Sequence, residues 1–304
     1  MSSIQETAEK LHANLYGKKK EDLILDVIMT NNLQNRVAIA QYYRATYETQ
    51  LFDDIKSKIG DDFGYCAAQL FLSPLEFCIY HLKLGLKKGN ECTMEMLTSK
   101  TIEELKIIED AFNKEVTDQK KTLRAQIQNV YDKSIAPIIL TLFSTPRKSN
   151  PKPNKDECQA YAIKLTKIEP KKWIENQNIF KEIFIERSPE ELILIARYYL
   201  KLTGENLIDV IEKKTKGKVQ TLIKELLYNN IMPHELFAEK IHSAIKGAGT
   251  DEEVLSRALV SRCELDMAAM RDIYQTKYKV TMKEDIIDDT SGPYQKLCVY
   301  LSEK

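Results

Sequence analysis

The chain repeats one sequence unit four times, and this repetition limits the folds open to it more than any other feature. Each copy has an apolar helix end, a short polar break and a new helix that opens with polar or acidic residues. The four copies read IMTNNLQNRVAIAQYY from residue 28, MLTSKTIEELKIIEDAF from 96, IFIERSPEELILIARYY from 183 and ALVSRCELDMAAMRDIY from 258. Capping boxes are expected at Thr101 with Glu104 and at Ser188 with Glu191. Such repetition is typical of proteins whose units bury apolar faces against each other.

The spacing of the copies predicts where the repeats begin and end. The polar breaks recur every 70 to 75 residues or so, except for a wider gap between the second and the third copy. The segment FSTPRKSNPKPNKDE, residues 143–157, accounts for this gap, because its Pro, Ser, Asn and Lys residues are typical of a linker. The predicted division is repeat 1 over 1–72, repeat 2 over 73–145, a linker over 146–156, repeat 3 over 157–230 and repeat 4 over 231–304.

Composition narrows the class of protein. Ten glycines and nine prolines are few for 304 residues, and strand alternation is absent, so an all-α chain is expected. With 45 basic and 45 acidic residues the net charge is zero, which argues against nucleic-acid binding. No apolar stretch approaches the 20 or so residues of a membrane span, and no signal peptide is evident, so we expect a cytoplasmic protein.

Six scattered cysteines without a C-x-x-C pair predict reduced core residues. No nucleophile motif, phosphate loop or catalytic dyad is present, so an enzyme is not expected.

The last repeat shows the expected unit most clearly. Helices are predicted from Pro233 to Ile245, after Thr250, after Arg262, around Met282 to Ile286, and after Gly292. Thr250 is predicted to cap the second of these, with Glu253 completing a capping box. The fold class is therefore all-α, with five helices in each repeat.

Residues 246–253, KGAGTDEE, are followed about forty residues later by DTSG from Asp289. The last carbonyls of a helix lack partners, and glycines allow a loop to direct several carbonyls at one point. A hard cation such as Ca²⁺ prefers such oxygens together with carboxylates and water. The alternative is that Gly247 merely ends one helix and that the polar residues cap the next helices.

IKGAGTDEEVLSRALVSR and IIDDTSGPYQKL, read together, resemble the core of an annexin repeat. The rest of the chain is similar in spacing, including the longer middle linker. The eroded early repeats and the short N-terminal tail resemble the annexin-like alpha-giardins. The resemblance implies four five-helix repeats that form a curved disc, with the loops between the first and second and between the fourth and fifth helices of each repeat on its convex face.

The resemblance also implies a calcium site in repeat 4. Its ligands would be the carbonyls of Ile245, Gly247 and Gly249 and the carboxylate of Asp289. An accessory site would use the carbonyl of Thr250 and the side chain of Glu252. With one firm carboxylate the site should be weak alone, and a lipid phosphate would complete the coordination, so that ion and membrane raise each other's affinity.

The other repeats depart from this pattern. Repeat 1 has NLYGKKKEDL, repeat 2 LGLKKGNE and repeat 3 KKWIENQN, and the acid position falls at Lys58, near Val130 and at Lys214. An irregular calcium site in repeat 1 would use Glu21, Asp61 and Asp62. Lysines in or near these loops predict calcium-independent contacts to anionic lipid or sulfated glycans. The predicted lipid-binding set is Lys18, Lys19, Lys20, Lys58, Lys87, Lys88, Lys172, Lys214 and Lys246. Trp173 is expected either at a membrane interface or in the core.

The leading expected function is calcium-dependent, partly calcium-independent, binding to anionic phospholipid at the inner face of the plasma membrane, linking membrane and cytoskeleton. The first alternative is a structural cytoskeleton-associated protein with little calcium dependence, which would bind filaments in chelator. A binder of sulfated glycans and a helical scaffold for peptides are further alternatives. Expected partners are acidic phospholipid, cytoskeletal filaments and sulfated glycans, with no nucleic acid, and the expected cofactor is Ca²⁺.

Overall fold

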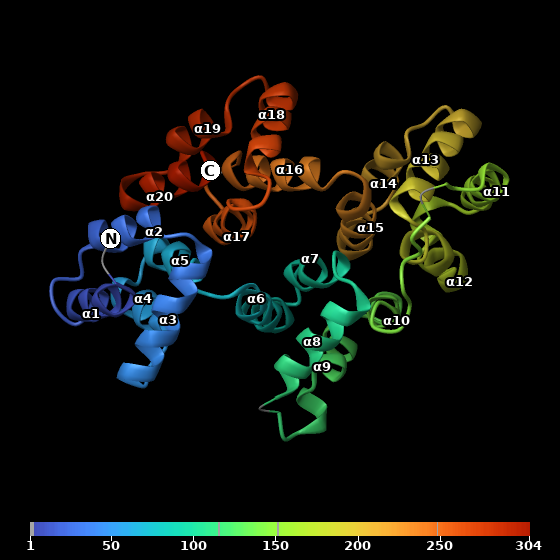
Figure 1. The fold of residues 1–304 in the computed structure, drawn as a ribbon. Helices are drawn as coiled ribbons and strands as arrows, with labels where there is room; N and C mark the ends of the chain where they lie inside the picture. The colour runs from blue at the N-terminus through green and yellow to red at the C-terminus, as the bar shows by residue number, and fades with distance from the viewer. Residues whose placement is uncertain (1–2, 115, 151, 248) are drawn as a thin grey trace. The chain divides into compact units, whose positions relative to one another are not determined.

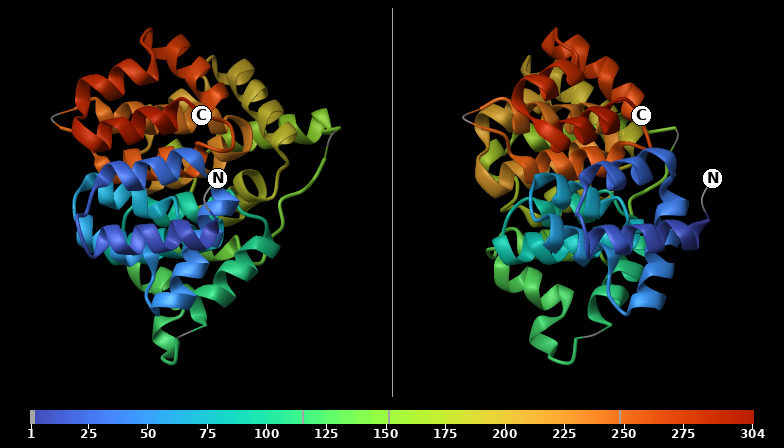
Figure 2. Two further views of the ribbon diagram at one scale, coloured as in Figure 1. Left: turned by 60° about the vertical axis from the view of Figure 1, so that its left-hand side comes forward. Right: turned by 90° about the vertical axis from the view of Figure 1, so that its left-hand side faces the viewer.

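The computed structural model describes residues 3–114, 116–150, 152–247 and 249–304. Every regular element in these ranges is a helix (Figure 1 and Figure 2), so the all-α prediction is confirmed. The chain divides into two compact units. Unit 1 consists of residues 1–77 and 234–304, and unit 2 of residues 78–233.

The two ends of the chain supply the helices of unit 1. These are α1 (Ile4–Leu15), α2 (Glu21–Thr30), α3 (Leu33–Tyr47), α4 (Leu51–Ile59), α5 (Asp62–Gln69), α16 (Pro233–Ile245), α17 (Glu252–Arg262), α18 (Met267–Tyr278), α19 (Met282–Asp289) and α20 (Gly292–Ser302). The last five begin and end close to the five helices predicted for repeat 4.

The middle of the chain supplies the helices of unit 2. These are α6 (Pro74–Lys88), α7 (Cys92–Thr98), α8 (Ile102–Asn113), α9 (Leu123–Val130), α10 (Ala136–Thr141), α11 (Lys155–Thr166), α12 (Gln177–Phe180), α13 (Pro189–Thr203), α14 (Leu207–Lys214) and α15 (Gly217–Ile231). Short 3₁₀ turns occupy Gln119–Lys121 and Pro170–Lys172, and a π-helical turn at Lys181–Ile185 extends α12.

In the described residues the helices therefore follow one another in four sets of five, as the repeat pattern predicts. The division between the units, after residues 77 and 233, falls within a few residues of the predicted boundaries after 72 and 230. The individual repeat boundaries stay a prediction.

The predicted capping boxes begin two of the helices. Thr101 accepts the amide of Glu104 at 3.2 Å, and the Glu104 carboxylate accepts the amide of Thr101 at 2.8 Å. Ser188 and Glu191 make the same reciprocal pair at the start of α13. These contacts satisfy amides that a helix start leaves without partners, so both predictions are confirmed.

Unit 1 has a single hydrophobic core to which both ends of the chain contribute. Helix α5 packs against α17 and α20, and α2 packs against α20. At the edge of this core, Arg36 is buried, and its guanidinium donates to the Leu70 carbonyl at 2.8 Å and to Glu264 at 2.9 Å. Residues more than two hundred positions apart are thus joined by packing and by a partly buried ion pair.

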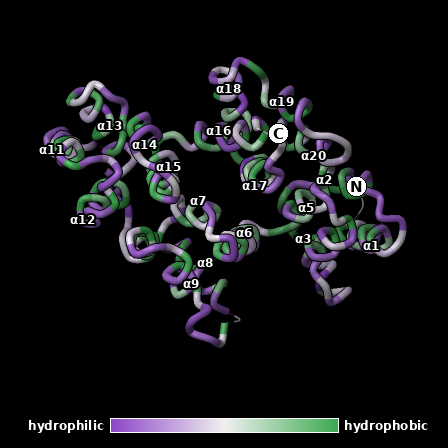
Figure 3. The backbone as a smooth tube through the Cα atoms, turned by 180° about the vertical axis from the view of Figure 1, so that it is seen from behind, coloured by the Kyte–Doolittle hydropathy of each residue, from purple (hydrophilic) through white to green (hydrophobic). Residues whose placement is uncertain are grey.

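Hydrophilic and hydrophobic stretches are mixed along the helices, as the hydropathy colouring in Figure 3 shows. Among the described residues no helix is long and apolar enough to cross a membrane. All six cysteines are buried free thiols, which agrees with the prediction that they are reduced core residues.

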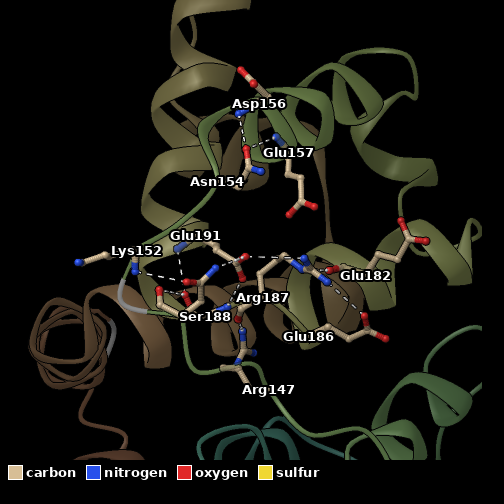
Figure 4. A network of polar contacts seen from close by, with 11 residues as sticks. Arg147, Lys152, Asn154, Asp156, Glu157, Glu182, Glu186, Arg187, Ser188 and Glu191 are labelled. Carbon is tan, nitrogen blue, oxygen red and sulfur yellow. Dashed lines mark hydrogen bonds and ion pairs between the residues drawn. The ribbon is translucent and has the colours of Figure 1, made fainter.

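The connection between α10 and α11 is fastened to repeat 3 by polar contacts (Figure 4). The Arg147 guanidinium donates to the carbonyls of Phe184 at 2.7 Å and Arg187 at 2.5 Å. Asn150 donates its side-chain amide to Glu191 at 3.1 Å, and the Lys148 amide donates to the Glu186 carbonyl at 2.7 Å. The predicted linker is therefore an ordered strap over the described part of its length.

An aromatic cluster with a buried aspartate lies against α19 in repeat 4. The His242 ring stacks on Tyr278 with a centroid distance of 3.6 Å, and the Tyr274 hydroxyl donates to Asp285 at 2.7 Å. The Lys246 ammonium contacts the other oxygen of Asp285 at 2.8 Å. Burial alone would raise the pKa of Asp285, but the Lys246 and Tyr274 contacts hold it below its ordinary value.

Repeat 1 contains the same cluster. His12 stacks on Tyr47 at 3.7 Å, and the Tyr43 hydroxyl donates to Asp54 at 2.6 Å. Counting four residues on from Asp54 and Asp285 reaches Lys58 and Asp289. The shared geometry therefore places Lys58 and Asp289 at equivalent positions, in agreement with the sequence comparison.

Replacing Asp285 by Asn removes the charge that pairs with Lys246, and we expect the free energy of unfolding at pH 7 to fall by about 2 kcal/mol. Because the folded state lowers the pKa of Asp285, its stabilisation is complete above the pKa of an unfolded aspartate, about 4, and disappears as the pH falls through the lower folded pKa. Urea titrations at several pH values should show the difference between native and variant chains shrinking below about pH 4. Asp288→Asn, at an exposed position of the same helix, is the control. A difference that stays constant down to the acid limit would contradict this account.

Candidate cation site and basic loops

The loop between α16 and α17 is closed by two backbone hydrogen bonds. The amide of Lys246 donates to the His242 carbonyl at 2.9 Å, and that of Asp251 donates to the Ala244 carbonyl at 2.8 Å. Gly249 has φ 115°, in the region that side chains disfavour, so a glycine is required there. Ala248 lies outside the described residues.

Asp289, at the end of α19, is linked to this loop by hydrogen bonds from Thr250. The Thr250 hydroxyl lies 2.7 Å from the Asp289 carboxylate and 3.0 Å from its carbonyl oxygen. The prediction that Thr250 caps α17 with Glu253 is therefore wrong. Asp251 is the cap, and its carboxylate accepts the Val254 amide at 2.9 Å. Thr250 instead holds a carboxylate 39 positions away in the sequence beside the glycine loop.

The carbonyls of Ile245, Gly247 and Gly249 accept no hydrogen bond from the described residues. Among all the described residues, no three His, Cys, Asp or Glu side chains lie close enough together to hold a metal ion. A cation at this loop would therefore be bound mainly by carbonyls, with Asp289 as the anchored carboxylate. Hard oxygen donors of this kind suit Ca²⁺. The residues fit the predicted ligand set, and the site itself stays a prediction.

Glu252, the predicted accessory ligand, lines a pocket of about 440 Å³ together with Glu253, Asp61 and Asp62. Asp61 also caps α5, because it accepts the Gly64 amide at 2.8 Å. Glu21 stands at the start of α2 and is not part of this lining. Two of the three acids proposed for repeat 1, Asp61 and Asp62, thus lie beside repeat 4, and among the described residues the three form no group that could hold a metal ion.

In repeat 1 the loop after α1 is ordered by Asn14, which is buried. Its side chain accepts the Lys20 amide at 3.0 Å and donates to the Lys20 carbonyl at 3.1 Å, while its own carbonyl accepts the Lys19 amide at 2.8 Å. These bonds hold Lys19 at φ 51° and leave the side chains of Lys18, Lys19 and Lys20 exposed. No ion pair within the described residues involves these three ammonium groups.

Lys58, at the position of Asp289, is engaged inside its own repeat. Its ammonium lies 3.7 Å from the centre of the Tyr16 ring and 3.9 Å from Asp54. It therefore replaces a carboxylate ligand with a cation that has internal partners.

In repeat 2 the loop after α6 is closed by its own backbone and by a tyrosine. The amides of Gly89 and Asn90 both donate to the Gly85 carbonyl, and the Tyr131 hydroxyl donates to the Asn90 carbonyl at 2.7 Å. A methyl group placed on Gly89 would lie 3.4 Å from the Val130 side chain, so an apolar residue faces the loop where repeat 4 has Asp289. Lys87 is exposed beside this loop, as is Lys88.

In repeat 3 the indole of a tryptophan donates to backbone carbonyls at the end of α11 and just after it. Trp173 is 1% exposed, and its indole N–H lies 3.2 Å from the Leu165 carbonyl and 3.1 Å from the Ile168 carbonyl. Of the two predicted roles for Trp173, the core position is confirmed. Lys214 pairs with Glu205 at 2.6 Å, and Lys172 lies 3.6 Å from Glu169.

The structure sorts seven of the nine predicted lipid-binding lysines into two groups, and the other two, Lys87 and Lys88, are exposed beside the repeat-2 loop. Lys58, Lys172, Lys214 and Lys246 have carboxylate partners, and the bond to Asp285 raises the pKa of Lys246. Lys18, Lys19 and Lys20 form the exposed basic group. Sequence analysis missed the roles of Asn14, Tyr131 and Trp173 as partners of the loop backbones, because nothing in the sequence links a side chain to a particular carbonyl.

Several known proteins resemble this chain in sequence and in fold. The annexin family model matches residues 165–226 and 236–301. Human annexin A13 is 27% identical over 302 residues, which cover 98% of this chain and 95% of that protein. A solved structure of annexin III superposes with a TM-score of 0.85 at 26% identity, over 100% of this chain and 94% of that one. The calcium-bound structure of alpha-14 giardin has a TM-score of 0.79 at 16% identity, over 99% of this chain and 100% of that one, which shows a shared fold alone.

Annexins are generally non-enzymatic proteins that bind phospholipid in a calcium-dependent manner. The narrower alpha-giardin branch stays a prediction. The family model over those two segments, the full-length sequence relatives and the shared fold all show that the chain is similar to annexins.

Proposed function

We propose that this chain binds anionic phospholipid surfaces and that calcium at the α16–α17 loop assists this binding. The observation that supports the proposal is that the carbonyls of Ile245, Gly247 and Gly249 accept no hydrogen bond from the described residues and lie in the loop to which Thr250 anchors the Asp289 carboxylate. The carbonyls of Ile245, Gly247 and Gly249 and the carboxylate of Asp289 would hold the ion. The Thr250 carbonyl and the Glu252 side chain would form the accessory site. Ca²⁺ would supply positive charge with open coordination positions for a lipid phosphate.

The role of this chain's own residues is to hold the oxygen ligands in place before the ion arrives. Thr250 orients Asp289, and the Asp251–Ala244 hydrogen bond fixes the loop. A single firm carboxylate gives weak affinity, on the order of 10⁻⁴ to 10⁻³ M for the ion alone. Because ion and lipid complete one another's contacts, each raises the affinity for the other by linkage.

Calcium-independent attraction is assigned to the exposed basic group of repeat 1. Lys18, Lys19 and Lys20 protrude from an ordered loop and have no carboxylate partner in the described residues. Each lysine near an anionic surface contributes about 1 kcal/mol. Lys58 and Lys214 contribute less, because binding a phosphate would compete with their own partners.

The setting we propose is the inner face of the plasma membrane, where the chain would link lipid to cytoskeletal filaments. The alternative, a cytoskeletal protein with little calcium dependence, is favoured by the three loops whose backbones already have partners. Sulfated glycans are a further proposed ligand for Lys18, Lys19 and Lys20. Co-sedimentation with filaments in chelator, without vesicles, would favour the cytoskeletal alternative.

Asp289→Ala removes the anchored carboxylate, and we expect at least about a tenfold rise in the calcium concentration needed for half-maximal binding to phosphatidylserine vesicles. Vesicle sedimentation across a calcium series measures this change. Asp288→Ala removes an exposed carboxylate one residue away and should leave the midpoint unchanged. An identical calcium midpoint in the Asp289 variant and the native chain would refute the site.

Thr250→Val keeps the shape of the side chain but removes the hydroxyl that holds Asp289. We expect the calcium midpoint to rise by about tenfold, since groups that orient a metal ligand affect affinity on that scale. Binding in chelator should not change, and the same sedimentation series supplies both values. If the hydroxyl served only to stabilise the fold, the urea midpoint would fall while the calcium midpoint stayed the same.

Replacing Lys18, Lys19 and Lys20 together by Gln should weaken vesicle binding in chelator at low salt by about a hundredfold. The calcium-dependent increment should persist, because the variant leaves repeat 4 intact. Lys114, Lys120 and Lys121 replaced by Gln make the same change in charge on the α8–α9 connection and serve as control. Equal weakening in both triple variants would mean that net charge, not this loop, governs the attraction.

A further inference from the structure

A second polar pocket lies wholly within unit 2, apart from the candidate cation loop. Its volume is about 360 Å³, and it is formed by the α7–α8 connection, the strap after α10, and the ends of two helical segments of repeat 3. Such a volume suits a small ligand. Its lining contains hydroxyl groups, including Ser99 and Thr145, the two cationic side chains Lys100 and Arg147, and an apolar wall that includes Leu142 and Ile185.

Arg147 is the unusual member of this lining. Its guanidinium has two carbonyl partners, Phe184 and Arg187, and no carboxylate within ion-pair distance among the described residues. Burial lowers its pKa to about 10. Carbonyl partners satisfy hydrogen bonds but carry no negative charge, so a partly desolvated positive charge remains without a counter-ion.

The nearby acids do not supply that counter-ion. Glu186 and Glu191 lie 3.4 and 3.8 Å from the neighbouring Arg187 (Figure 4). Glu191 also accepts the Ser188 amide and the Asn150 side chain. Glu186 also lies 3.8 Å from Lys181, so these two carboxylates are paired with two cations, Arg187 and Lys181. Arg147 keeps N–H donors without a hydrogen-bond partner among the described residues, beside the pocket.

Lys100 adds a second positive charge to the lining. Its only ion pair in the described residues is a long one, 3.9 Å from Glu104, whose other oxygen accepts the Thr101 amide. One carboxylate, Glu103, also lines the pocket, but its side chain is exposed to solvent. The pocket thus offers two cations and several hydroxyl donors to one anionic group.

We propose that this pocket binds a small organic phosphate. The phosphate group would accept hydrogen bonds from Arg147, Lys100 and the hydroxyls, because its oxygens can accept from several donors at once and match the guanidinium fork. The organic part would rest on the wall of Leu142 and Ile185. The site requires no calcium, and it shares no residue with the α16–α17 loop.

The test is isothermal titration calorimetry of the full chain in chelator, with phenyl phosphate and inorganic phosphate as probes. We expect phenyl phosphate to bind about tenfold more tightly than inorganic phosphate, because only the former reaches the apolar wall. Lys100→Gln should weaken phenyl phosphate about tenfold, and Ser99→Phe should abolish binding by filling the pocket. Lys106→Gln, the same charge change at an exposed position of α8, is the control.

Arg147→Lys tests the central charge but also disturbs the strap, so its urea midpoint is measured with its affinity. Because Lys100→Gln and Ser99→Phe leave the Arg147 bonds intact, they decide the proposal even if the Arg147 variant unfolds. Phenyl phosphate binding that is absent, or that stays unchanged in both of these variants, would overturn it. Asp289→Ala should bind the probe normally, which separates this site from the proposed calcium site.

Vesicles containing phosphatidylinositol 4-phosphate distinguish the source of the phosphate. If they displace phenyl phosphate in chelator while phosphatidylcholine vesicles do not, the ligand is a lipid headgroup. If neither vesicle competes but the probe binds as expected, the ligand is a soluble phosphate ester. Both results support a phosphate site in this pocket, and each identifies where the phosphate comes from.

Discussion

The carbonyl oxygens left without partners at the C-terminal end of a helix are the constraint on which the loops of this chain depend. The repeats differ in which groups, if any, donate hydrogen bonds to these carbonyls. In repeat 1 the Asn14 carbonyl accepts the Lys19 amide, and in repeat 2 the Gly85 carbonyl accepts two loop amides. In repeat 3 the indole of Trp173 donates to the Leu165 carbonyl. Only the repeat-4 loop, among the described residues, leaves its carbonyls open beside an anchored carboxylate.

Repeat 4 also differs from repeats 1 and 3 in the charge beside the loop. Where repeat 4 has Asp289, repeats 1 and 3 have Lys58 and Lys214, and each lysine is paired with an acid of its own repeat. Exchanging a ligand for a paired cation removes the cation site without leaving a charge unbalanced. The result is a neutral chain in which the proposed calcium site lies in one loop and the exposed basic group in another. The membrane binding proposed above therefore depends on where these charges lie, not on their sum.

Much of the fold was predictable because helix signals are local. The capping boxes at Thr101 and Ser188 follow from residues three positions apart, and the five helices of repeat 4 lie where the periodicity predicted them. Thr250 shows the limit of this reasoning. It has the residue type and position of a helix cap, but Asp251 makes that bond, while Thr250 donates to Asp289. A local pattern could not choose between two neighbouring caps when the outcome depends on a distant carboxylate.

The sequence by itself determined the helical repeats, the glycine at position 249 that a positive φ requires, and the carboxylate at Asp289. These depend on spacing along the chain. Only the tertiary structure decided that Trp173 is buried against helix-end carbonyls, that the Lys58 ammonium lies over the Tyr16 ring, and that Arg147 has no carboxylate partner among the described residues. Each of these depends on which groups meet in space once the helices pack, and hydrogen bonds and ion pairs act only over a few ångströms.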